Sequence, residues 1–323
     1  MEQKLLEVKN LKKWFPVDSD SFFPQKKQFL KAVDDISFFI NKGETLGLVG
    51  ESGCGKSTAG RSVLRLLEAT EGSVFLDGED IYNLSSSRLK KKRNEMQIVF
   101  QDPYASLNPR LKVRSIIEEP LIIHTNLTKK QRREKLSQLM QDVGLDESYL
   151  ERYPHEFSGG QRQRIGIARA IAVQPKLIVM DEPVSALDVS VQAQVLNLIQ
   201  DLQEKYQLTY LFITHNLSVV KHISNRIAVM YLGKIVEIAD RETFFKDPKH
   251  PYSGALISAI PEPNPKLKKE RVILQGDVPS PVNPPSGCPF HTRCPLVMDR
   301  CKSEVPQLKD VGNNQIVACH LHE

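Results

Sequence analysis

The segment from Gly50 to Ser57 constrains this chain more than any other part of its sequence. It reads GESGCGKS, which matches G-x-x-x-x-G-K-[ST], and it follows an apolar run, Thr45–Val49, that predicts a buried strand. Glycines at these positions let the backbone wrap closely around phosphates, so that successive N–H groups and the start of a helix face the negative charge. The sequence therefore predicts a phosphate site in which Lys56 reaches the β- and γ-phosphates and Ser57 ligates Mg²⁺.

Seven consecutive residues of this loop are the expected nucleotide contacts: Ser52, Gly53, Cys54, Gly55, Lys56, Ser57 and Thr58. Cys54 stands at a position where the pattern accepts any residue. A space-filling role is therefore favoured for this thiol over redox chemistry.

Two carboxylates follow a second apolar run, Leu177–Met180. Asp181 comes first, at the edge of the predicted sheet, where its carboxylate can hold Mg²⁺. Glu182 is then placed to polarise a water for attack on the γ-phosphate. Acids at the end of a strand are common, but together with the phosphate loop they indicate hydrolysis of a nucleoside triphosphate.

Further motifs complete a pattern known from one family. They are Ser158–Gln161 (SGGQ), Ser185–Asp188 (SALD), Gln101 within VFQD, His215 within ITH, and Phe15 within KKWF. With these motifs, in this order and spacing, the chain resembles ATP-binding-cassette (ABC) ATPase subunits over residues 1 to about 255.

The resemblance implies a role for each motif. Ser158, Gly159, Gly160 and Gln161 would bind a phosphate of the ATP held by an opposing subunit, and Asp188 belongs to the loop that accompanies them. Gln101 would sense Mg²⁺ or the attacking water, and His215 would contact the γ-phosphate, so Glu182, His215 and Gln101 form the implied catalytic set. Phe15, rather than Trp14, would stack on adenine. Metal contacts to Mg²⁺ would come from Ser57, Gln101 and Asp181.

The order of predicted elements fits an α/β fold. Strands alternate with helices, which favours a mainly parallel sheet. The resemblance implies a RecA-like core with an antiparallel β part and a helical subdomain.

Two local predictions are a helix over Arg61–Glu68 and a solvated helix face at Lys90–Arg93. For the basic run, a nucleic-acid or lipid contact is the alternative. Composition turns proline-rich after about Ser258. We therefore expect an ABC ATPase domain over 1–255 and a small irregular cysteine-containing domain over 256–323.

Longer stretches narrow the resemblance to one branch. QDPYASLNPR (101–110), RYPHEF (152–157), DEPVSALDVSVQ (181–192) and KHPY (249–252) are similar to oligopeptide and dipeptide importer ATPases, in particular the F-type subunit (OppF/DppF-like). The insertion between Phe15 and Leu30 agrees with that choice. The branch implies a D-type ATPase partner, two transmembrane permease subunits, an extracytoplasmic peptide-binding protein acting indirectly, and a peripheral position on the cytoplasmic face of the membrane. Nickel importers share the branch, so peptide and nickel both remain open as cargo.

Four of the five cysteines fall near the end of the chain: Cys288, Cys294, Cys301 and Cys319. Their spacing, C-x5-C-x6-C-x17-C, is loose for structural zinc, whereas four thiolates and adjacent prolines also suit a [4Fe–4S] cluster. Similar tails in the peptide-importer branch carry such clusters. An iron–sulfur cluster is the favoured interpretation, with zinc or unligated thiols as alternatives.

Composition excludes several other classes. No stretch reaches the roughly 18 apolar residues of a membrane span, and the N-terminus lacks the apolar core of a signal peptide. Soluble ABC proteins of translation or DNA repair generally carry two cassettes or a long coiled-coil insertion, and this chain shows neither. A net charge of +5 and a tail without interleaved aromatic residues give little support to nucleic-acid binding.

Overall fold

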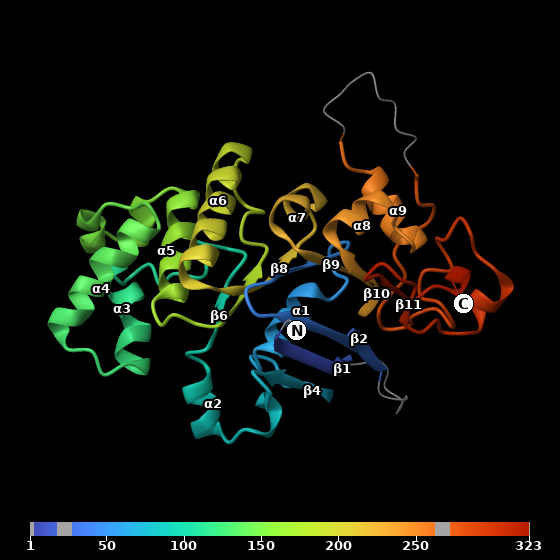
Figure 1. Ribbon diagram of the computed structural model, residues 1–323, viewed down its shortest axis with the longest axis horizontal. Helices are drawn as coiled ribbons and strands as arrows, with labels where there is room; N and C mark the ends of the chain where they lie inside the picture. Colours follow the sequence, from blue (N-terminus) through green and yellow to red (C-terminus); the bar gives the residue numbers. More distant parts are fainter. Residues whose placement is uncertain (1–2, 18–27, 262–271, 323) are drawn as a thin grey trace, which may run out of the picture. The chain divides into compact units, whose positions relative to one another are not determined.

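The computed structural model describes residues 3–17, 28–261 and 272–322 (Figure 1). The chain divides into two compact units. One unit comprises residues 1–6, 40–45 and 76–213, and the other comprises residues 7–39, 46–75 and 214–323. For brevity we call the first the helical unit and the second the loop unit, because the second contains the glycine-rich phosphate loop.

The helical unit is built on three parallel strands. β6 (Met96–Val99) pairs with β7 (Leu177–Asp181), and β7 pairs with β8 (Thr209–Thr214). Every residue of β7 and β8 is buried, as expected for parallel strands covered on both faces. Its helices are α2 (Ser86–Lys92), α3 (Val113–His124), α4 (Lys129–Asp142), α5 (Gly159–Ile171) and α6 (Val189–Tyr206), and the short strand β5 covers Glu79–Asp80.

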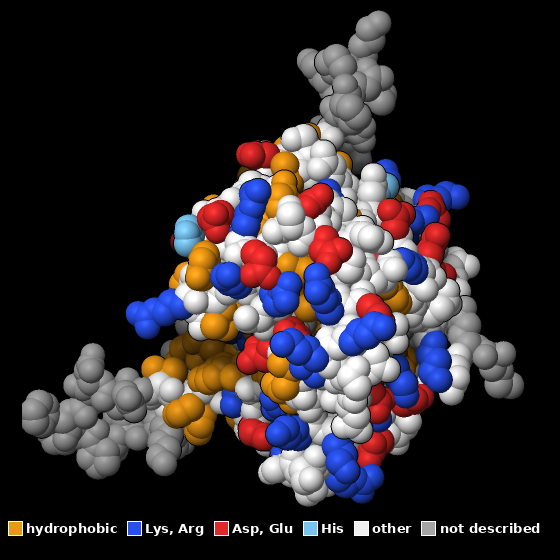
Figure 2. Space-filling model, turned by 90° about the vertical axis from the view of Figure 1, so that its left-hand side faces the viewer, with side chains coloured by type: hydrophobic (Ala, Val, Ile, Leu, Met, Phe, Trp, Pro, Cys, Tyr) orange, Lys and Arg blue, Asp and Glu red, His pale blue; other side chains and the backbone are white. Residues whose placement is uncertain are grey.

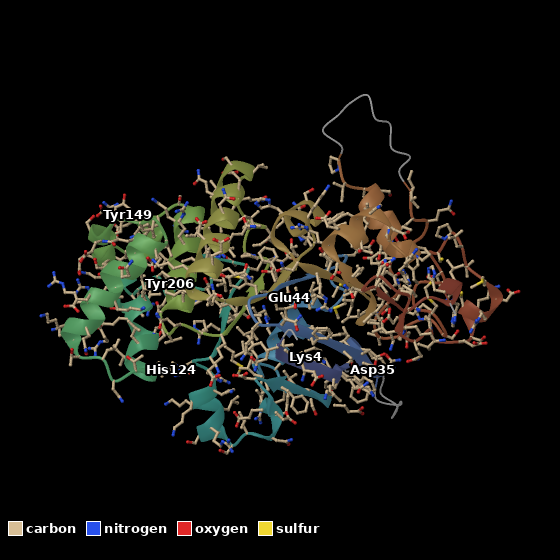
Figure 3. All side chains as sticks on the ribbon, viewed as in Figure 1. Lys4, Asp35, Glu44, His124, Tyr149 and Tyr206 are labelled. Atoms are coloured by element: carbon tan, nitrogen blue, oxygen red, sulfur yellow. The ribbon has the colours of Figure 1, made fainter. Side chains whose placement is uncertain are left out.

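Helices α3, α4 and α5 pack against one another, and α5 also packs against α6. A polar contact joins the ends of two of these helices. Tyr206, labelled in Figure 3, is the last residue of α6, and its hydroxyl donates to the Asp142 carboxylate of α4. Lys205 pairs with the same carboxylate, at 2.6 Å. Asp142 therefore fixes where α6 ends relative to α4.

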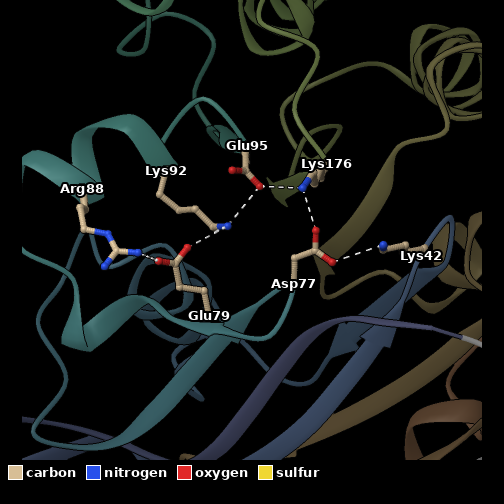
Figure 4. A network of polar contacts seen from close by, with 7 residues as sticks. All are labelled: Lys42, Asp77, Glu79, Arg88, Lys92, Glu95 and Lys176. Carbon is tan, nitrogen blue, oxygen red and sulfur yellow. Dashed lines mark hydrogen bonds and ion pairs between the residues drawn. The ribbon is translucent and has the colours of Figure 1, made fainter.

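A chain of alternating charges runs through the helical unit (Figure 4). Its members are Arg88, Glu79, Lys92, Glu95, Lys176, Asp77 and Lys42, with successive charges paired within 3.3 Å. The expectation that the basic run lies on a solvated helix face holds for Lys90 and Lys91, which are exposed. It is wrong for Lys92, which is buried because Glu79 and Glu95 both pair with its ammonium.

The loop unit contains parallel and antiparallel strands. β3 (Thr45–Val49) pairs in parallel with β9 (Arg226–Tyr231), β9 pairs antiparallel with β10 (Lys234–Asp240), and β12 (Ile316–Val317) lies between β10 and β11 (Lys309–Asp310). Three neighbouring strands of a second, four-stranded sheet lie in the order β2 (Gln28–Asn41), β1 (Lys4–Val17), β4 (Glu71–Leu76). The helices are α1 (Lys56–Val63), α7 (Leu217–Ile223), α8 (Arg241–Lys246) and α9 (Pro251–Ser258).

The α/β fold with parallel strands is confirmed, but the first helix is placed differently from the prediction. It begins at Lys56 and ends at Val63 rather than covering Arg61–Glu68. Arg65 has φ +51°, a left-handed conformation that an α-helix cannot continue through. The apolar spacing of Val63, Leu64 and Leu67 thus includes residues beyond the helix.

The described residues after α9, 259–261 and 272–322, belong to the loop unit. β12 pairs with β10 in the register Glu237↔Val317 and Ile238↔Ile316. Phe290 is fully buried with Tyr231 and Tyr252, in a core cluster that also contains Val49 of β3. The predicted boundary between residues 255 and 256 thus falls inside a stretch whose side chains share one core.

No helix among the described residues is long and apolar enough to cross a membrane. On the face drawn in Figure 2, Lys and Arg side chains are interspersed with Asp and Glu. That face therefore presents no broad surface of a single charge.

Candidate functional site

The phosphate loop passes very close to neighbouring backbone. A Cβ at Gly55 would lie 1.9 Å from the Ala32 carbonyl oxygen, and one at Gly50 would lie 2.2 Å from the Met230 carbonyl oxygen. Both glycines also have positive φ, +106° and +156°. Only glycine satisfies both demands, so these two positions of the motif are fixed by the fold as well as by the ligand.

Helix α1 starts directly from this loop. Gly55 is its N-cap, and no side chain caps the first turn. The opening N–H groups of a helix have no intrahelical acceptor, and their partial positive charge favours an anion. The start of α1 is therefore built to receive a phosphate group.

The Lys56 side chain is buried and lies inside the loop. Its ammonium donates hydrogen bonds to the carbonyl oxygens of Gly50 (2.8 Å) and Glu51 (2.9 Å). The Cys54 sulfur lies 3.8 Å from the same ammonium, and burial raises the pKa of this thiol. A buried neutral thiol beside the lysine agrees with the space-filling role predicted for Cys54.

The two predicted carboxylates lie at the end of β7 in the helical unit. Asp181 is 1% exposed and Glu182 is 8% exposed. Glu182 adopts φ +48°, which is uncommon for a residue other than glycine, and its N–H donates to the Ile213 carbonyl of β8 at 3.0 Å. Backbone of this kind is often found at functional sites.

Gln101 and Glu182, which are 81 positions apart in the sequence, are brought together. The Gln101 side-chain amide donates a hydrogen bond of 3.1 Å to the Glu182 carboxylate. The amide fixes the orientation of that carboxylate. The side-chain oxygens of Gln101 and Asp181 are of the type that Mg²⁺ prefers as ligands.

The SGGQ segment forms the start of α5 through a capping box. The Ser158 hydroxyl accepts from the Gln161 N–H at 3.4 Å, and the Gln161 side-chain oxygen accepts from the Ser158 N–H at 3.0 Å. Phe157, just before it, is buried and makes an edge-on ring contact with Tyr149 at 5.5 Å (Figure 3). The predicted helix start is confirmed, and Asp188 occupies the equivalent exposed N-cap position of α6.

Two predicted residues lie in the loop unit with the phosphate loop. His215 is exposed and directly follows β8, and Phe15 is half-buried on β1. The Lys13 ammonium lies 4.8 Å from the centre of the Phe15 ring. The Trp14 indole instead donates to Asp34 at 3.1 Å.

The four C-terminal cysteines share one neighbourhood. Cys288 and Cys301 are buried, and the Cys288 N–H donates to the Cys301 carbonyl at 2.8 Å. Burial, with smaller contributions from the other three thiols, raises the pKa of Cys288 to about 11. Within residues 3–17, 28–261 and 272–322, however, no three His, Cys, Asp or Glu side chains are grouped so as to hold a metal ion.

Sequence reasoning missed a set of contacts on the phosphate loop. The Arg293 guanidinium pairs with the Glu51 carboxylate, and the Tyr252 hydroxyl accepts from the Glu51 N–H at 2.9 Å. Tyr252 belongs to the KHPY stretch and Arg293 precedes Cys294, but no spacing rule connects either of them with Glu51.

Comparison with known proteins places these observations in a family. The ABC transporter family model matches residues 33–185, and the model of the oligopeptide/dipeptide transporter C-terminal region matches residues 236–301. The chain is 54% identical to the oligopeptide transport ATP-binding protein AppF of Bacillus subtilis, over 99% of this chain and 98% of that protein. It is 51% identical to a probable peptide ABC transporter ATP-binding protein of Sinorhizobium fredii, over 99% and 91% of the two chains.

Solved structures agree on the fold. The ATP-binding cassette MJ0796, solved as a dimer in a post-hydrolysis state with ADP and Pi, matches with a TM-score of 0.64 and 28% identity. That match covers 73% of this chain and 98% of the other. The predicted ABC ATPase fold is therefore confirmed.

The two glycines that open α5 differ in the space around them, which yields a first prediction. A Cβ at Gly160 would lie 2.4 Å from Cγ1 of Val191, whose branched side chain is stiff, whereas one at Gly159 would lie 3.4 Å from Leu187. We expect Gly160→Ala to lower the free energy of unfolding by about 1–3 kcal/mol through overpacking. Urea denaturation monitored by circular dichroism measures the change.

Gly159→Ala is the matched control and should leave the stability close to that of the wild type. Adding Val191→Ala to Gly160→Ala should recover part of the loss. A Gly160→Ala protein as stable as the wild type would show that α5 and α6 do not pack as described.

Proposed function

This chain belongs to the ABC transporter ATP-binding proteins, in the branch with an oligopeptide/dipeptide transporter C-terminal region, and we propose that its ATP hydrolysis energises import of oligopeptides or dipeptides through a membrane complex. One observation carries the proposal: the nucleotide motifs and the branch-specific C-terminal region occur together in a chain that matches peptide-transport ATP-binding proteins over its whole length. Soluble ABC proteins of translation or DNA repair are not favoured, because the C-terminal region matched here is that of peptide transporters.

The loop and helix α1 bind the nucleotide in this proposal. Their N–H groups face the phosphates, and the Lys56 ammonium, which the Gly50 and Glu51 carbonyls hold in place, donates to the β- and γ-phosphate oxygens. Ser57, Asp181 and Gln101 would hold Mg²⁺, which neutralises charge on the phosphates when bound. Phe15 stacks on adenine, and its half-buried ring is consistent with that role.

Glu182 acts as the general base on the attacking water. Its carboxylate is buried and held by the Gln101 amide, which fixes the direction from which it can accept a proton. His215 contacts the γ-phosphate and helps to orient the water. The contact between Gln101 and Glu182 supports the assignment of both residues to one step.

The partners follow from what one chain contains. This chain contains one phosphate loop and one SGGQ segment. A second ATPase subunit would supply its own SGGQ-type segment to the ATP on this loop, and Ser158–Gln161 and Asp188 of this chain would reach the ATP held by that subunit. The dimeric solved cassette supports this arrangement. We propose a D-type heterodimeric partner, two transmembrane permease subunits, an extracytoplasmic binding protein that this chain does not contact, and a peripheral position at the cytoplasmic face of the membrane.

A [4Fe–4S] cluster in the C-terminal region is part of the proposal. Four thiols in one neighbourhood are the donor type that such clusters take. The described side chains are not arranged as a ready-made metal site, so ligation requires the thiols to come closer together. Zinc and unligated thiols are the competing outcomes.

Transport by the assembled complex tests the proposed function. Proteoliposomes that contain this chain, its ATPase partner, both permeases and the binding protein should accumulate labelled short peptides only when ATP is supplied on the side of the ATPase. Uptake of labelled nickel without peptide uptake would reassign the cargo. ATP-independent uptake, or none of either cargo, would overturn the proposal.

Substitution of the general base separates binding from hydrolysis. Glu182→Gln should still bind ATP, lose at least about 100-fold in turnover, and accumulate as an ATP-bound dimer, since general bases contribute roughly 10²–10⁴ in rate. Turnover, nucleotide binding and size-exclusion chromatography measure the three effects. Lys56→Ala is the comparison, because it should weaken nucleotide binding itself; hydrolysis by Glu182→Gln near the wild-type rate would refute the assignment.

Metal content tests the cluster. Protein purified without oxygen should be brown, absorb light at about 400 nm, and contain about four iron ions and four sulfide ions per chain. Cys294→Ser should lose this iron, whereas Cys54→Ser, outside the cluster, should keep it. Colourless protein with one zinc would establish the zinc alternative, and colourless protein without metal would establish unligated thiols.

A further inference from the structure

All the main polar groups of Glu51, the second residue of the phosphate loop, are engaged within the loop unit. Its N–H donates to the Tyr252 hydroxyl at 2.9 Å, and its carbonyl accepts from the Lys56 ammonium at 2.9 Å. Its carboxylate accepts two hydrogen bonds from Arg293, at 2.8 Å to Nη1 and 3.2 Å to Nη2. Two of these three groups thus depend on residues more than 200 positions away, in the C-terminal region.

Arg293 and Glu51 form a bidentate ion pair that is largely buried on the arginine side. The Arg293 side chain is 9% exposed and that of Glu51 is 30% exposed. The two parallel hydrogen bonds are charge-assisted and bidentate, which fixes direction as well as distance. The hydrogen bonds that Arg293 donates to Glu51 raise the pKa of its guanidinium above its usual range.

Arg293 is itself held on a rigid support. Its guanidinium lies 6.0 Å from the centre of the Tyr231 ring, and the Tyr231, Tyr252 and Phe290 rings contact one another at 4.8–5.3 Å with all three fully buried. The Arg293 N–H donates to the Phe290 carbonyl at 3.0 Å. Aromatic groups packed in this way change position only at considerable cost.

These contacts lead from the aromatic cluster to the phosphate-binding lysine through one residue. Arg293 and Tyr252 hold Glu51, and the Glu51 carbonyl is one of two acceptors that hold Lys56. We propose that Arg293, assisted by Tyr252, is a positioning residue of the phosphate loop, through which the C-terminal region sets the affinity of the loop for the ATP phosphates. This inference rests on the proposed ATPase function and deepens it.

A positioning role makes a specific kinetic prediction. Glu182 and Gln101 do not belong to this set of contacts, so the chemistry of a saturated site should be unaffected. Loss of the pair should instead let the loop adopt other conformations and weaken nucleotide binding by roughly tenfold, the change in Kd that corresponds to one charge-assisted hydrogen bond. The KM for ATP should therefore rise while kcat remains within about twofold of the wild type.

The test uses the full chain in its assembled complex, with a fluorescent ATP analogue for affinity and phosphate release for kinetics. Arg293→Met removes the charge but keeps a long side chain, Arg293→Lys keeps the charge but loses the second hydrogen bond, and Glu51→Gln removes the charge from the other side. All three should raise Kd and KM, with Arg293→Lys the mildest. Combining Arg293→Met with Glu51→Gln should add little to either single change, because both remove the same contact.

Arg300→Met is the matched control. It removes another arginine of the C-terminal region, one that pairs with Glu304 on the surface, and should leave Kd, KM and kcat unchanged. Wild-type Kd in Arg293→Met, or a loss of kcat at unchanged KM, would overturn the positioning role. Should the methionine variant fail to fold, Arg293→Lys alone decides between these outcomes.

The experiment also distinguishes the two proposals. A wild-type complex that binds the analogue but neither hydrolyses ATP nor transports peptide would refute the proposed function. The effect of Arg293 on binding would still be measurable in that case. A complex that transports peptide while Arg293→Met and Arg293→Lys bind ATP like the wild type would refute only the positioning role.

Discussion

The close approach of the phosphate loop to its neighbouring backbone governs the rest of the loop unit. Gly55 lies against the Ala32 carbonyl and Gly50 against the Met230 carbonyl, with no room for a side chain at either. The Cys54 carbonyl, between them, accepts from the Gly233 N–H at 2.9 Å. Strands β2 and β9 and the turn between β9 and β10 therefore shape the loop from outside, and no side chain caps the start of α1.

The loop points two carbonyl groups, those of Gly50 and Glu51, toward the buried side chain of Lys56. A buried carbonyl without a hydrogen bond would destabilise the folded chain. Lys56 compensates by donating to both, so the ammonium is buried without losing its hydrogen bonds. In the proposed function the same lysine binds phosphate. The two carbonyls fix where its ammonium lies within the loop.

Sequence patterns predicted the parts of the site that are local. The loop, the capping box at Ser158 and the strand before Asp181 are each read from a few adjacent residues, and each appears where it was expected. Burial and pairing across long separations were not predictable. Lys92 looks solvated in a run of lysines, yet it is buried and pairs with Glu79 and Glu95. Helix α1 ends earlier than its apolar spacing suggests, because Arg65 adopts a left-handed conformation.

The contact of Arg293 with Glu51 shows most clearly why such features escape sequence reasoning. An arginine between two cysteines suggests a metal site or an exposed charge, and a glutamate within a glycine-rich loop suggests a surface position. Only the fold, which brings β12 against β10 and buries Phe290 beside Tyr231, places their charges together. The cysteine-containing segment Cys288–Cys294 therefore shares a core with Val49, the residue that directly precedes the phosphate loop. A change that displaces this segment, by ligation of its thiols or otherwise, therefore acts through Arg293 on Glu51, whose carbonyl is one of the two that hold Lys56.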